Sequence, residues 1–498
     1  MRHDVHCRIA DNFPSLWSPR QTLVATSLFA LTVVNGAAAA DAISLYNISQ
    51  NQSNFGSVLS EVKVSPSNSN LIAVAWRRYL LPINTNGDTV TRNADCHVSV
   101  SFDAGNTFRD TNLMPYLREP AVNVGEPEPN LYFCNQPWVA FGSDGLMYGG
   151  GSMFTPLGTI GPLPKQGRVM FTTSADSGLT WNAPTYGIRF NNFAPGLTGL
   201  SGGTAPEDTP WDGSNGFADP VTPTFYTTSG GYVTATNDHG NTFTTVYELT
   251  SQSLPGWTVG SVGVMNAASG VLGAPFTASN TPITGAACPC LGYATSVNFG
   301  KTWSAHLVAQ ASQFNSTTTG DTARTPFSAS DPSAPGTRVA ISAYTLDHKS
   351  VQVFYTQDGG TTWQSAAATP PTGVTIATAG KPGVGYTLDG GILVVWRSYE
   401  VPNAVFDTFA ALLHGNQFGP TIRVSPQSSK YPYLTMQAAC TAYVPPPPTG
   451  ACYDTANGGG DFVTWITGNH DYAFVTFPYI PDAFHEDMYF AKIPLSMM

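Results

Sequence analysis

Short runs of apolar and β-branched residues, separated by Gly, Pro, Asn, Asp and Ser, follow one another along most of the chain. Runs of about four to eight such residues between turn formers are typical of β-strands, and no long stretch has the 3.6-residue periodicity of a helix. The pattern therefore predicts an all-β protein. The predicted strands fall into seven groups: 61–66, 70–76 and 96–100; 136–144, 146–148 and 168–172; 219–225 and 231–235; 261–266; 324–331, 337–343 and 351–355; 381–389 and 391–396; and 431–436, 461–466, 472–477 and 488–493.

One eight-residue pattern closes five of these groups. Its clearest copy is Ser-Ala-Asp-Ser-Gly-Leu-Thr-Trp at 174–181, and the others begin at Ser101, Thr236, Ser296 and Thr356. The Asp side chain can accept bonds from nearby backbone N–H groups and the Gly supplies a backbone angle that other residues avoid, so each copy predicts a tight turn. The copies start 73, 62, 60 and 60 residues apart, and a period of this kind indicates a repeat architecture.

This pattern, Ser/Thr-x-Asp-x-Gly-x-Thr-Trp/Phe, resembles the Asp-box, also called the bacterial neuraminidase repeat, although the fourth copy has Asn298 in place of Asp. The resemblance implies a sialidase-like β-propeller with the box between the third and fourth strands of a blade. We count seven four-stranded blades in one domain over residues 41–498. Six blades, as in the sialidases that the chain resembles, is the alternative.

The first 40 residues have the features of a signal peptide. Arg2, Arg8 and Arg20 precede an apolar run at 22–34, and small residues at 37–40 offer a cleavage site before Asp41. We therefore expect a secreted, extracellular protein with no membrane span after cleavage; a type II anchor is the alternative. Only 11% of the residues are charged and the net charge is −11, so nucleic acid is excluded as a partner. We expect a monomer.

Six cysteines remain after cleavage, and an even number in an oxidising compartment predicts disulfides. Cys440 and Cys452 could be bridged locally, and Cys96 could be joined to Cys134. A bridge across the single residue between Cys288 and Cys290 would be strained, and a metal site there is disfavoured because no second Cys/His pair has ligand spacing. No cofactor is predicted, apart from a possible structural calcium ion at 212–216.

Polar residues recur where the innermost strands of six of the seven predicted blades begin. These are Glu61, Gln136, Asp219, Arg324, Lys381 and Tyr431. They predict a ring around a binding pocket at one mouth of the central channel. The alternative is that they cap strands at a wet channel mouth.

A second set follows the second strands, at 76–79, 346–348, 396–400 and 469–471. In 396–400, Tyr399 stands beside Glu400 and close to Arg397, and the resemblance to sialidases implies a Tyr nucleophile activated by a Glu. It further implies Asp219 or Glu61 as the acid, and basic residues that grip a substrate carboxylate. The candidates for this grip are Arg77, Arg78, Arg324, Arg397 and Lys381. They are candidates by position only, because the sialidase motif Phe/Tyr-Arg-Ile-Pro does not precede the first box.

Three functions are compatible with these residues. The first is an exo-acting, sialidase-type glycoside hydrolase on sialic or uronic acid glycans. The second is a uronate polysaccharide lyase, in which Tyr399, His348 or His470 would be the base. The third is a propeller that binds a glycan or a protein at the channel mouth without catalysis, which the missing arginine motif favours.

Overall fold

The structure is a computed structural model that describes residues 42–50, 55–80, 95–117, 133–154, 166–191, 215–282, 287–315, 326–370, 374–400, 405–430, 464–482 and 485–498. These residues belong to one compact unit, Asp41–Met498. The predicted signal peptide, the calcium loop before Asn215 and the cysteines at 440 and 452 lie outside the described residues. No helix in the described part of the chain is long and apolar enough to cross a membrane.

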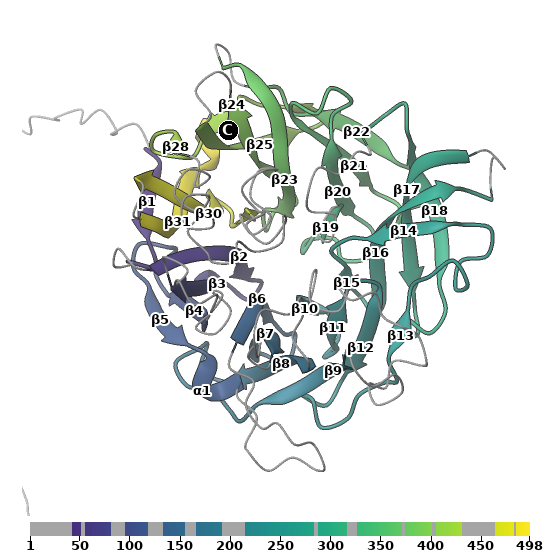
Figure 1. The fold of residues 1–498 in the computed structure, drawn as a ribbon, viewed down its shortest axis with the longest axis horizontal. Helices are drawn as coiled ribbons and strands as arrows, with labels where there is room; N and C mark the ends of the chain where they lie inside the picture. The colour runs from purple at the N-terminus through teal and green to yellow at the C-terminus, as the bar shows by residue number, and fades with distance from the viewer. Residues whose placement is uncertain are drawn as a thin grey trace, which may run out of the picture. The chain divides into compact units, whose positions relative to one another are not determined.

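Seven small antiparallel sheets form a ring (Figure 1), so the predicted seven-bladed β-propeller is confirmed. In each sheet one strand contacts the corresponding strand of the neighbouring sheet, and these seven strands surround the axis. The described residues contain almost no helix: α1 (Met114–Leu117) follows the first blade, and a 3-10 turn lies at Leu495–Met497.

The first three blades, from the innermost strand outward, are as follows. Blade 1 is β2 (Phe55–Ser65), β3 (Asn68–Leu80), β4 (Asp95–Ser101) and β5 (Arg109–Asn112). Blade 2 is β6 (Phe133–Phe141), β7 (Met147–Phe154), β8 (Gln166–Ser174) and β9 (Thr185–Asn191). Blade 3 is β10 (Asn215–Ala218), β11 (Phe225–Ser229), β12 (Tyr232–Thr236) and β13 (Tyr247–Glu248).

The next three blades keep this order. Blade 4 has an interrupted inner strand, β14 (Val259–Val262) and β15 (Asn266–Ala268), followed by β16 (Val271–Asn280), β17 (Ala287–Ser296) and β18 (Ser304–Gln310). Blade 5 is β19 (Phe327–Ser330), β20 (Val339–Tyr344), β21 (Val351–Thr356) and β22 (Gln364–Ala367). Blade 6 is β23 (Ile376–Tyr386), β24 (Ile392–Glu400) and β25 (Val405–His414), with β26 (Gln417–Phe418), β27 (Ile422–Arg423) and β28 (Ser429–Lys430) on its outer edge.

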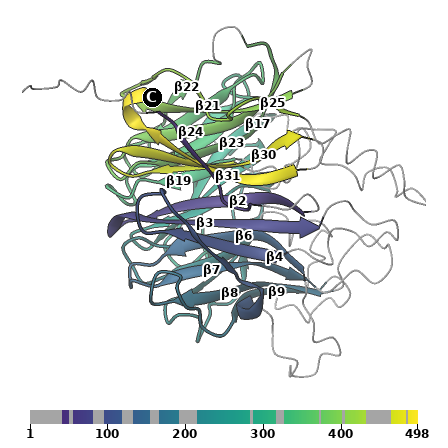
Figure 2. The same cartoon turned by 90° about the vertical axis from the view of Figure 1, so that its left-hand side faces the viewer.

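Blade 7 joins the two ends of the described chain. It consists of β29 (Trp465–Gly468), β30 (Tyr472–Asp482), β31 (His485–Pro494) and, outermost, β1 (Ser44–Asn47), which pairs antiparallel with β31 (Figures 1 and 2). Ser49 reinforces this closure, because its Oγ donates to Asp487 Oδ1 (2.9 Å) and accepts from the N–H of Met488 (3.0 Å).

The predicted order of the strands in blade 7 was wrong. The run 461–466, predicted to be a second strand, ends in the innermost strand β29, and the run 472–477 belongs to the second strand β30. The run 488–493 lies in the third strand, β31, and the ring is closed by β1, which the sequence pattern did not predict. The predicted run 431–436 lies outside the described residues.

The five repeat turns (101–108, 174–181, 236–243, 296–303 and 356–363) each connect a third strand to a fourth, as predicted. In the second turn Asp176 Oδ1 accepts from the N–H of Thr180 (2.8 Å), and Asp176 Oδ2 accepts from the Thr180 hydroxyl (2.6 Å). Ser174 Oγ accepts from the N–H of Gly178 (2.8 Å), whose φ of 88° is the left-handed conformation that favours glycine. In the fourth turn Asn298 Oδ1 likewise accepts from the N–H of Thr302 (2.9 Å), but its Nδ2 donates to the Thr302 hydroxyl (2.9 Å).

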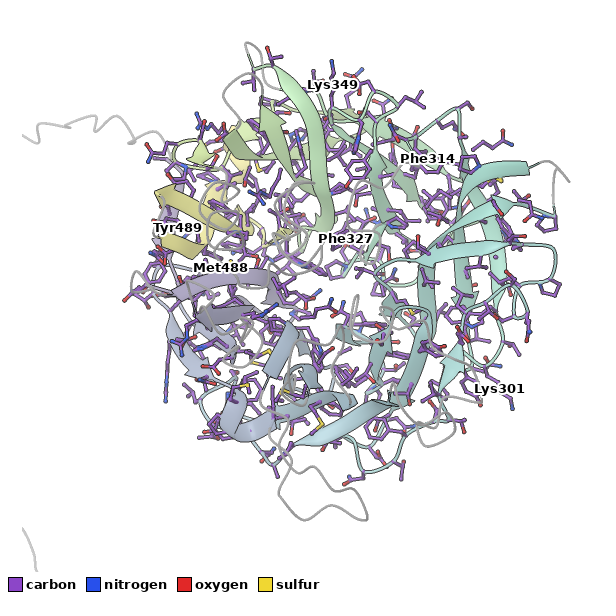
Figure 3. All side chains as sticks on the ribbon, viewed as in Figure 1. Lys301, Phe314, Phe327, Lys349, Met488 and Tyr489 are labelled. Atoms are coloured by element: carbon purple, nitrogen blue, oxygen red, sulfur yellow. A yellow bond between two sulfur atoms is a disulfide. The ribbon has the colours of Figure 1, made fainter. Side chains whose placement is uncertain are left out.

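The cores lie between the blades (Figure 3). Trp138 of β6 is 1% exposed and its ring lies 5.3 Å from that of Phe225 in the next blade. Glycines make room for the indole: a Cβ on Gly216 of β10 would lie 2.5 Å from Trp138. The ring of Phe327, which Figure 3 shows near the axis, meets that of Trp465 at 5.3 Å and so joins blade 5 to blade 7 across the channel.

Two disulfides are present among the described residues. Cys96 of β4 is joined to Cys134 of β6, which confirms the predicted bridge between the first two blades. Cys288 and Cys290 of β17 are also joined.

Candidate functional site

The strand directions define two faces of the propeller. The repeat turns and the connections from inner to second strands lie on one face, which we call the turn face. The inner strands begin, and the second strands end, at the opposite face, which we call the loop face. Candidate residues can therefore be assigned to a face from their place in a strand.

Arg77 and Arg397 occupy equivalent positions in blades 1 and 6. Arg77 lies in β3 and pairs with Val58, and Arg397 lies in β24 and pairs with Gly380; in each blade the register of the inner strand then shifts by one residue. A tryptophan precedes each arginine, Trp76 in one blade and Trp396 in the other. The Trp-Arg dipeptide therefore recurs in the sequence at the same structural position in blades 1 and 6.

These irregularities are β-bulges in the inner strands, and blade 2 has one at the same place, between Asn135 and Trp138. Two bulge residues, Leu59 and Gln136, have φ of 52° and 48°, which non-glycine residues rarely adopt. Bulges are common beside active sites because they re-aim side chains. The loop-face half of the channel therefore carries the locally irregular backbone that a binding site needs.

Both arginines are buried. Arg77 is 5% exposed and Arg397 is 2% exposed. Removing a guanidinium from water is costly unless anionic or polar groups surround it. Both side chains have interactions within the protein, and the fold repeats this buried position at the loop-face ends of two second strands.

Arg78 has a different environment from Arg77. Its Nη2 donates to Asp95 Oδ2 (3.1 Å), which also accepts from Asn112 Nδ2 (3.1 Å). Both partners belong to blade 1: Asp95 begins β4 and Asn112 ends β5. This pair links strands within one sheet, and it is a weaker candidate for substrate contact than Arg77.

Glu61 lies in the middle of β2, with its side chain only 2% exposed, and Lys63 Nζ lies 2.8 Å from its Oε1. Residues two apart in a strand share a face, so Glu61 and Lys63 project from the same side of β2. Glu61 is the one acidic residue in the described inner strands. Lys63 was not among the predicted site residues, although its place two residues after Glu61 could have indicated the pair.

Asp219 does not share the loop-face location. The inner strand of blade 3 is β10, so Asp219 follows that strand instead of beginning it, and it lies on the turn face. Its Oδ1 accepts from the N–H groups of Val221 (2.8 Å), Thr222 (3.1 Å) and Ser269 (3.0 Å), and its Oδ2 accepts from that of Gly270. The carboxylate thus ties the turn of blade 3 to the turn of blade 4. The predicted alignment of Asp219 with Glu61 and Gln136 was wrong.

The remaining candidates are placed only in part. Lys381 lies in the bulge of β23, and Tyr399 and Glu400 end β24 at the loop face; their side chains are outside the described part of the structure. Arg324 and Tyr431 lie outside the described residues altogether. Lys381, Tyr399 and Glu400 therefore share the loop face with Arg397 at the level of the backbone.

The predicted alternative bases are divided between the faces. His348 follows the second strand β20 and is 8% exposed, and burial lowers its pKa, which the nearby Asp347 carboxylate partly offsets. His470 follows the inner strand β29 and so lies on the turn face, where its Nδ1 is 2.8 Å from Asp389 Oδ1. The assignment of 469–471 to the end of a second strand was wrong.

No cluster of three His, Cys, Asp or Glu side chains suited to a metal ion occurs within the described ranges. Arg77 and Arg397 lie in second strands beside bulged inner strands at the loop face, and Glu61 lies in the middle of β2.

Neither a protein-family profile nor a curated protein sequence matches this chain. Solved structures with a similar arrangement include a protein of unknown function from Dyadobacter fermentans (13% identity, TM-score 0.42, covering 90% of this chain and 99% of that one). Another is the NanB sialidase of Streptococcus pneumoniae (10% identity, TM-score 0.39, covering 90% of this chain and 97% of that one). A third is an α-L-arabinofuranosidase of Fusarium graminearum (12% identity, TM-score 0.42, covering 91% of this chain and 98% of that one). At these identities and scores the likeness says nothing about the chemistry of the site.

Proposed function

We propose that this propeller is a glycoside hydrolase that takes a carboxylated glycan, such as a sialic or uronic acid glycan, at its loop face. The observation that carries the proposal is the pair of buried arginines, Arg77 and Arg397, at equivalent positions in a chain with few charges. A guanidinium presents paired N–H donors that match a carboxylate.

The proposed roles follow from position. Arg77 and Arg397 hold the substrate carboxylate, Lys381 adds positive charge at the same face, and Tyr399 with Glu400 acts as the nucleophilic pair. Glu61 supplies the acid, because it is the one acidic residue in the described inner strands. Secretion through the segment 1–40 stays part of the proposal.

A second candidate function is glycan binding without turnover. Glycoside hydrolysis ordinarily uses two carboxyl groups that flank the bond, and Asp219, one of the two alternatives predicted for the acid, is held by four backbone N–H groups on the opposite face. Glu61 is paired with Lys63. If Glu400 does not reach the substrate, the site binds without catalysis.

The test is incubation of the purified protein with a panel of sialyl and uronyl glycans, read by mass spectrometry and by the ultraviolet absorbance of unsaturated uronates. We expect free sugar without that absorbance, and its release should be lost in Arg397→Gln. Arg338→Gln is the matched control, because Arg338 pairs with Asp331 on the turn face. Circular dichroism and thermal unfolding establish that each variant is folded, and Arg397→Lys provides a charge-conserving version.

The outcomes separate the candidates. Retained glycan without turnover in the wild type identifies a binding protein, and absorbance identifies a lyase. Equal turnover in folded Arg397→Gln and Arg338→Gln would exclude Arg397 from the site.

A further inference from the structure

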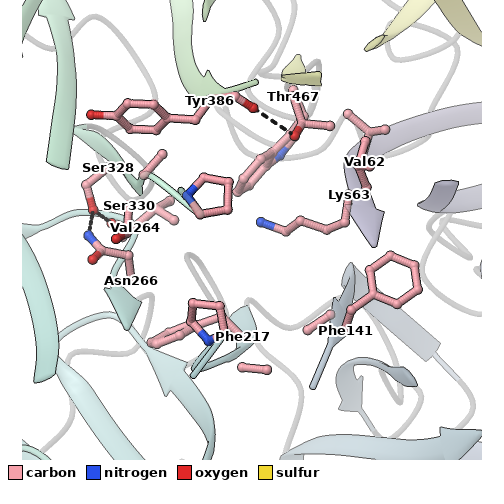
Figure 4. A pocket seen from close by; sticks show the side chains of 18 of the residues that line it. Val62, Lys63, Phe141, Phe217, Val264, Asn266, Ser328, Ser330, Tyr386 and Thr467 are labelled. Carbon is pink, nitrogen blue, oxygen red and sulfur yellow. Dashed lines mark hydrogen bonds between the residues drawn. The ribbon is translucent and has the colours of Figure 1, made fainter. Parts of the chain in front are cut away.

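A cavity of about 180 Å³ occupies the turn-face half of the central channel. It is lined by the last residues of all seven inner strands, from β2, β6, β10, β15, β19, β23 and β29 (Figure 4). Arg77 and Arg397 do not line it, so it is distinct from the loop-face site.

Most of the wall is apolar. Phe141, Phe217 and Trp465 line the cavity, and the rim includes Pro66, Pro220 and Pro332. Each proline stands in the connection that leaves an inner strand. Proline has no N–H to offer, so these turns present carbon surface, and the wall suits an apolar ring more than a hydroxyl-rich sugar.

Lys63 is the one charged side chain in this wall, and Figure 4 shows it reaching into the cavity. Its Nζ lies 2.8 Å from Glu61 Oε1 and 4.8 Å from the centre of the Trp465 ring, and its side chain is 33% exposed. An ammonium group has three N–H donors. One is taken by Glu61, which leaves donors directed toward the cavity.

Two further polar groups of the wall have no hydrogen-bond partner among the described residues. They are the indole Nε1–H of Trp465 and the hydroxyl of Ser330, and both atoms are buried. An unsatisfied buried donor is costly, and a small side-chain shift toward the cavity would bring either group to an anionic oxygen there. With Lys63 they supply three donors and no competing carboxylate apart from Glu61.

We propose that this cavity binds a small monocarboxylate that carries an apolar or aromatic ring, of the size of benzoate. The carboxylate would accept from Lys63, with Ser330 and Trp465 as the further donors, and the ring would lie against Phe217, Phe141 and the prolines. The volume agrees with this class, because an apolar cavity of about 150 Å³ accommodates benzene. A single lysine, already paired with Glu61, suits one negative charge better than a phosphate dianion.

The proposal does not depend on glycan hydrolysis at the loop face. Its test is isothermal titration calorimetry of the wild-type protein with benzoate and 3-phenylpropanoate, with benzamide as the neutral analogue. We expect saturable binding of the carboxylates, and binding of benzamide weaker by about tenfold or more because Lys63 favours the charged group.

Two variants locate the site. Lys63→Met should weaken benzoate binding by about tenfold or more, whereas Lys301→Met, at an exposed repeat turn, should leave it unchanged. Because Lys63→Met leaves Glu61 without its partner and could fail to fold, Ser330→Leu fills the cavity while the ion pair is kept, and it should abolish binding. The proposal is overturned if neither carboxylate binds, if benzamide binds as tightly as benzoate, or if Ser330→Leu binds benzoate like the wild type.

Discussion

Replacement of Ser174 by Ala tests the account of the repeat turns. The Ser174 hydroxyl donates to Asp176 Oδ1 and accepts from the buried N–H of Gly178, both at 2.8 Å. Alanine removes a hydrogen bond to a charged group and leaves the Gly178 N–H unsatisfied; either loss costs about 1–3 kcal/mol. The two losses are coupled, so we expect the free energy of unfolding to fall by about 2–3 kcal/mol.

The assay is urea unfolding followed by tryptophan fluorescence. For a denaturant dependence of about 3 kcal/mol per molar, the midpoint should fall by about 0.7–1 M urea. Ser174→Thr is the matched control, because Thr236 and Thr356 make the same contacts in the third and fifth turns. The reasoning is refuted if the Ala and Thr variants have the same midpoint.

Three further predictions concern stability. The Thr180 hydroxyl holds the pKa of Asp176 at about 2, below the value of about 4 in an unfolded chain. This stabilisation is present above pH 4 and is lost as the pH falls toward 2. In Asp176→Asn, which copies Asn298, the free energy of unfolding should therefore fall less steeply between pH 4 and pH 2 than in the wild type. Gly216→Ala should cost about 1–3 kcal/mol by overpacking against Trp138, measured by urea unfolding, and Trp138→Phe should recover part of the loss. Replacing Cys96 and Cys134 together by Ser should cost about 3–4 kcal/mol for a loop of 38 residues, seen as a lower thermal midpoint under non-reducing conditions; an unchanged midpoint would contradict a structural role for the bridge.

The sequence predicted what depends on local contacts. Each repeat turn forms bonds between residues two to four positions apart, as between Asp176 and Thr180, so an eight-residue pattern is sufficient to place it between a third and a fourth strand. The Trp-Arg dipeptides at 76–77 and 396–397 likewise indicated their shared place at the ends of second strands.

Contacts between distant parts of the chain could not be predicted in this way. The strand β1 pairs with β31 across more than four hundred residues, and its four residues have no pattern of their own. Asp219 was misassigned because half of its hydrogen-bond donors, the N–H groups of Ser269 and Gly270, come from the next blade. A carboxylate that begins a turn and one that lines a pocket look the same in a sequence.

The most direct test of the central claim, that the loop face recognises a carboxylate, is a comparison of one carboxylated glycan with its methyl ester. Turnover, or binding where there is no turnover, is measured for both compounds with the wild-type protein and with Arg77→Gln. The account predicts that the acid is turned over or bound, that the ester is weaker by about tenfold or more, and that Arg77→Gln reduces this difference. Equal turnover or binding of acid and ester by the wild-type protein would contradict it.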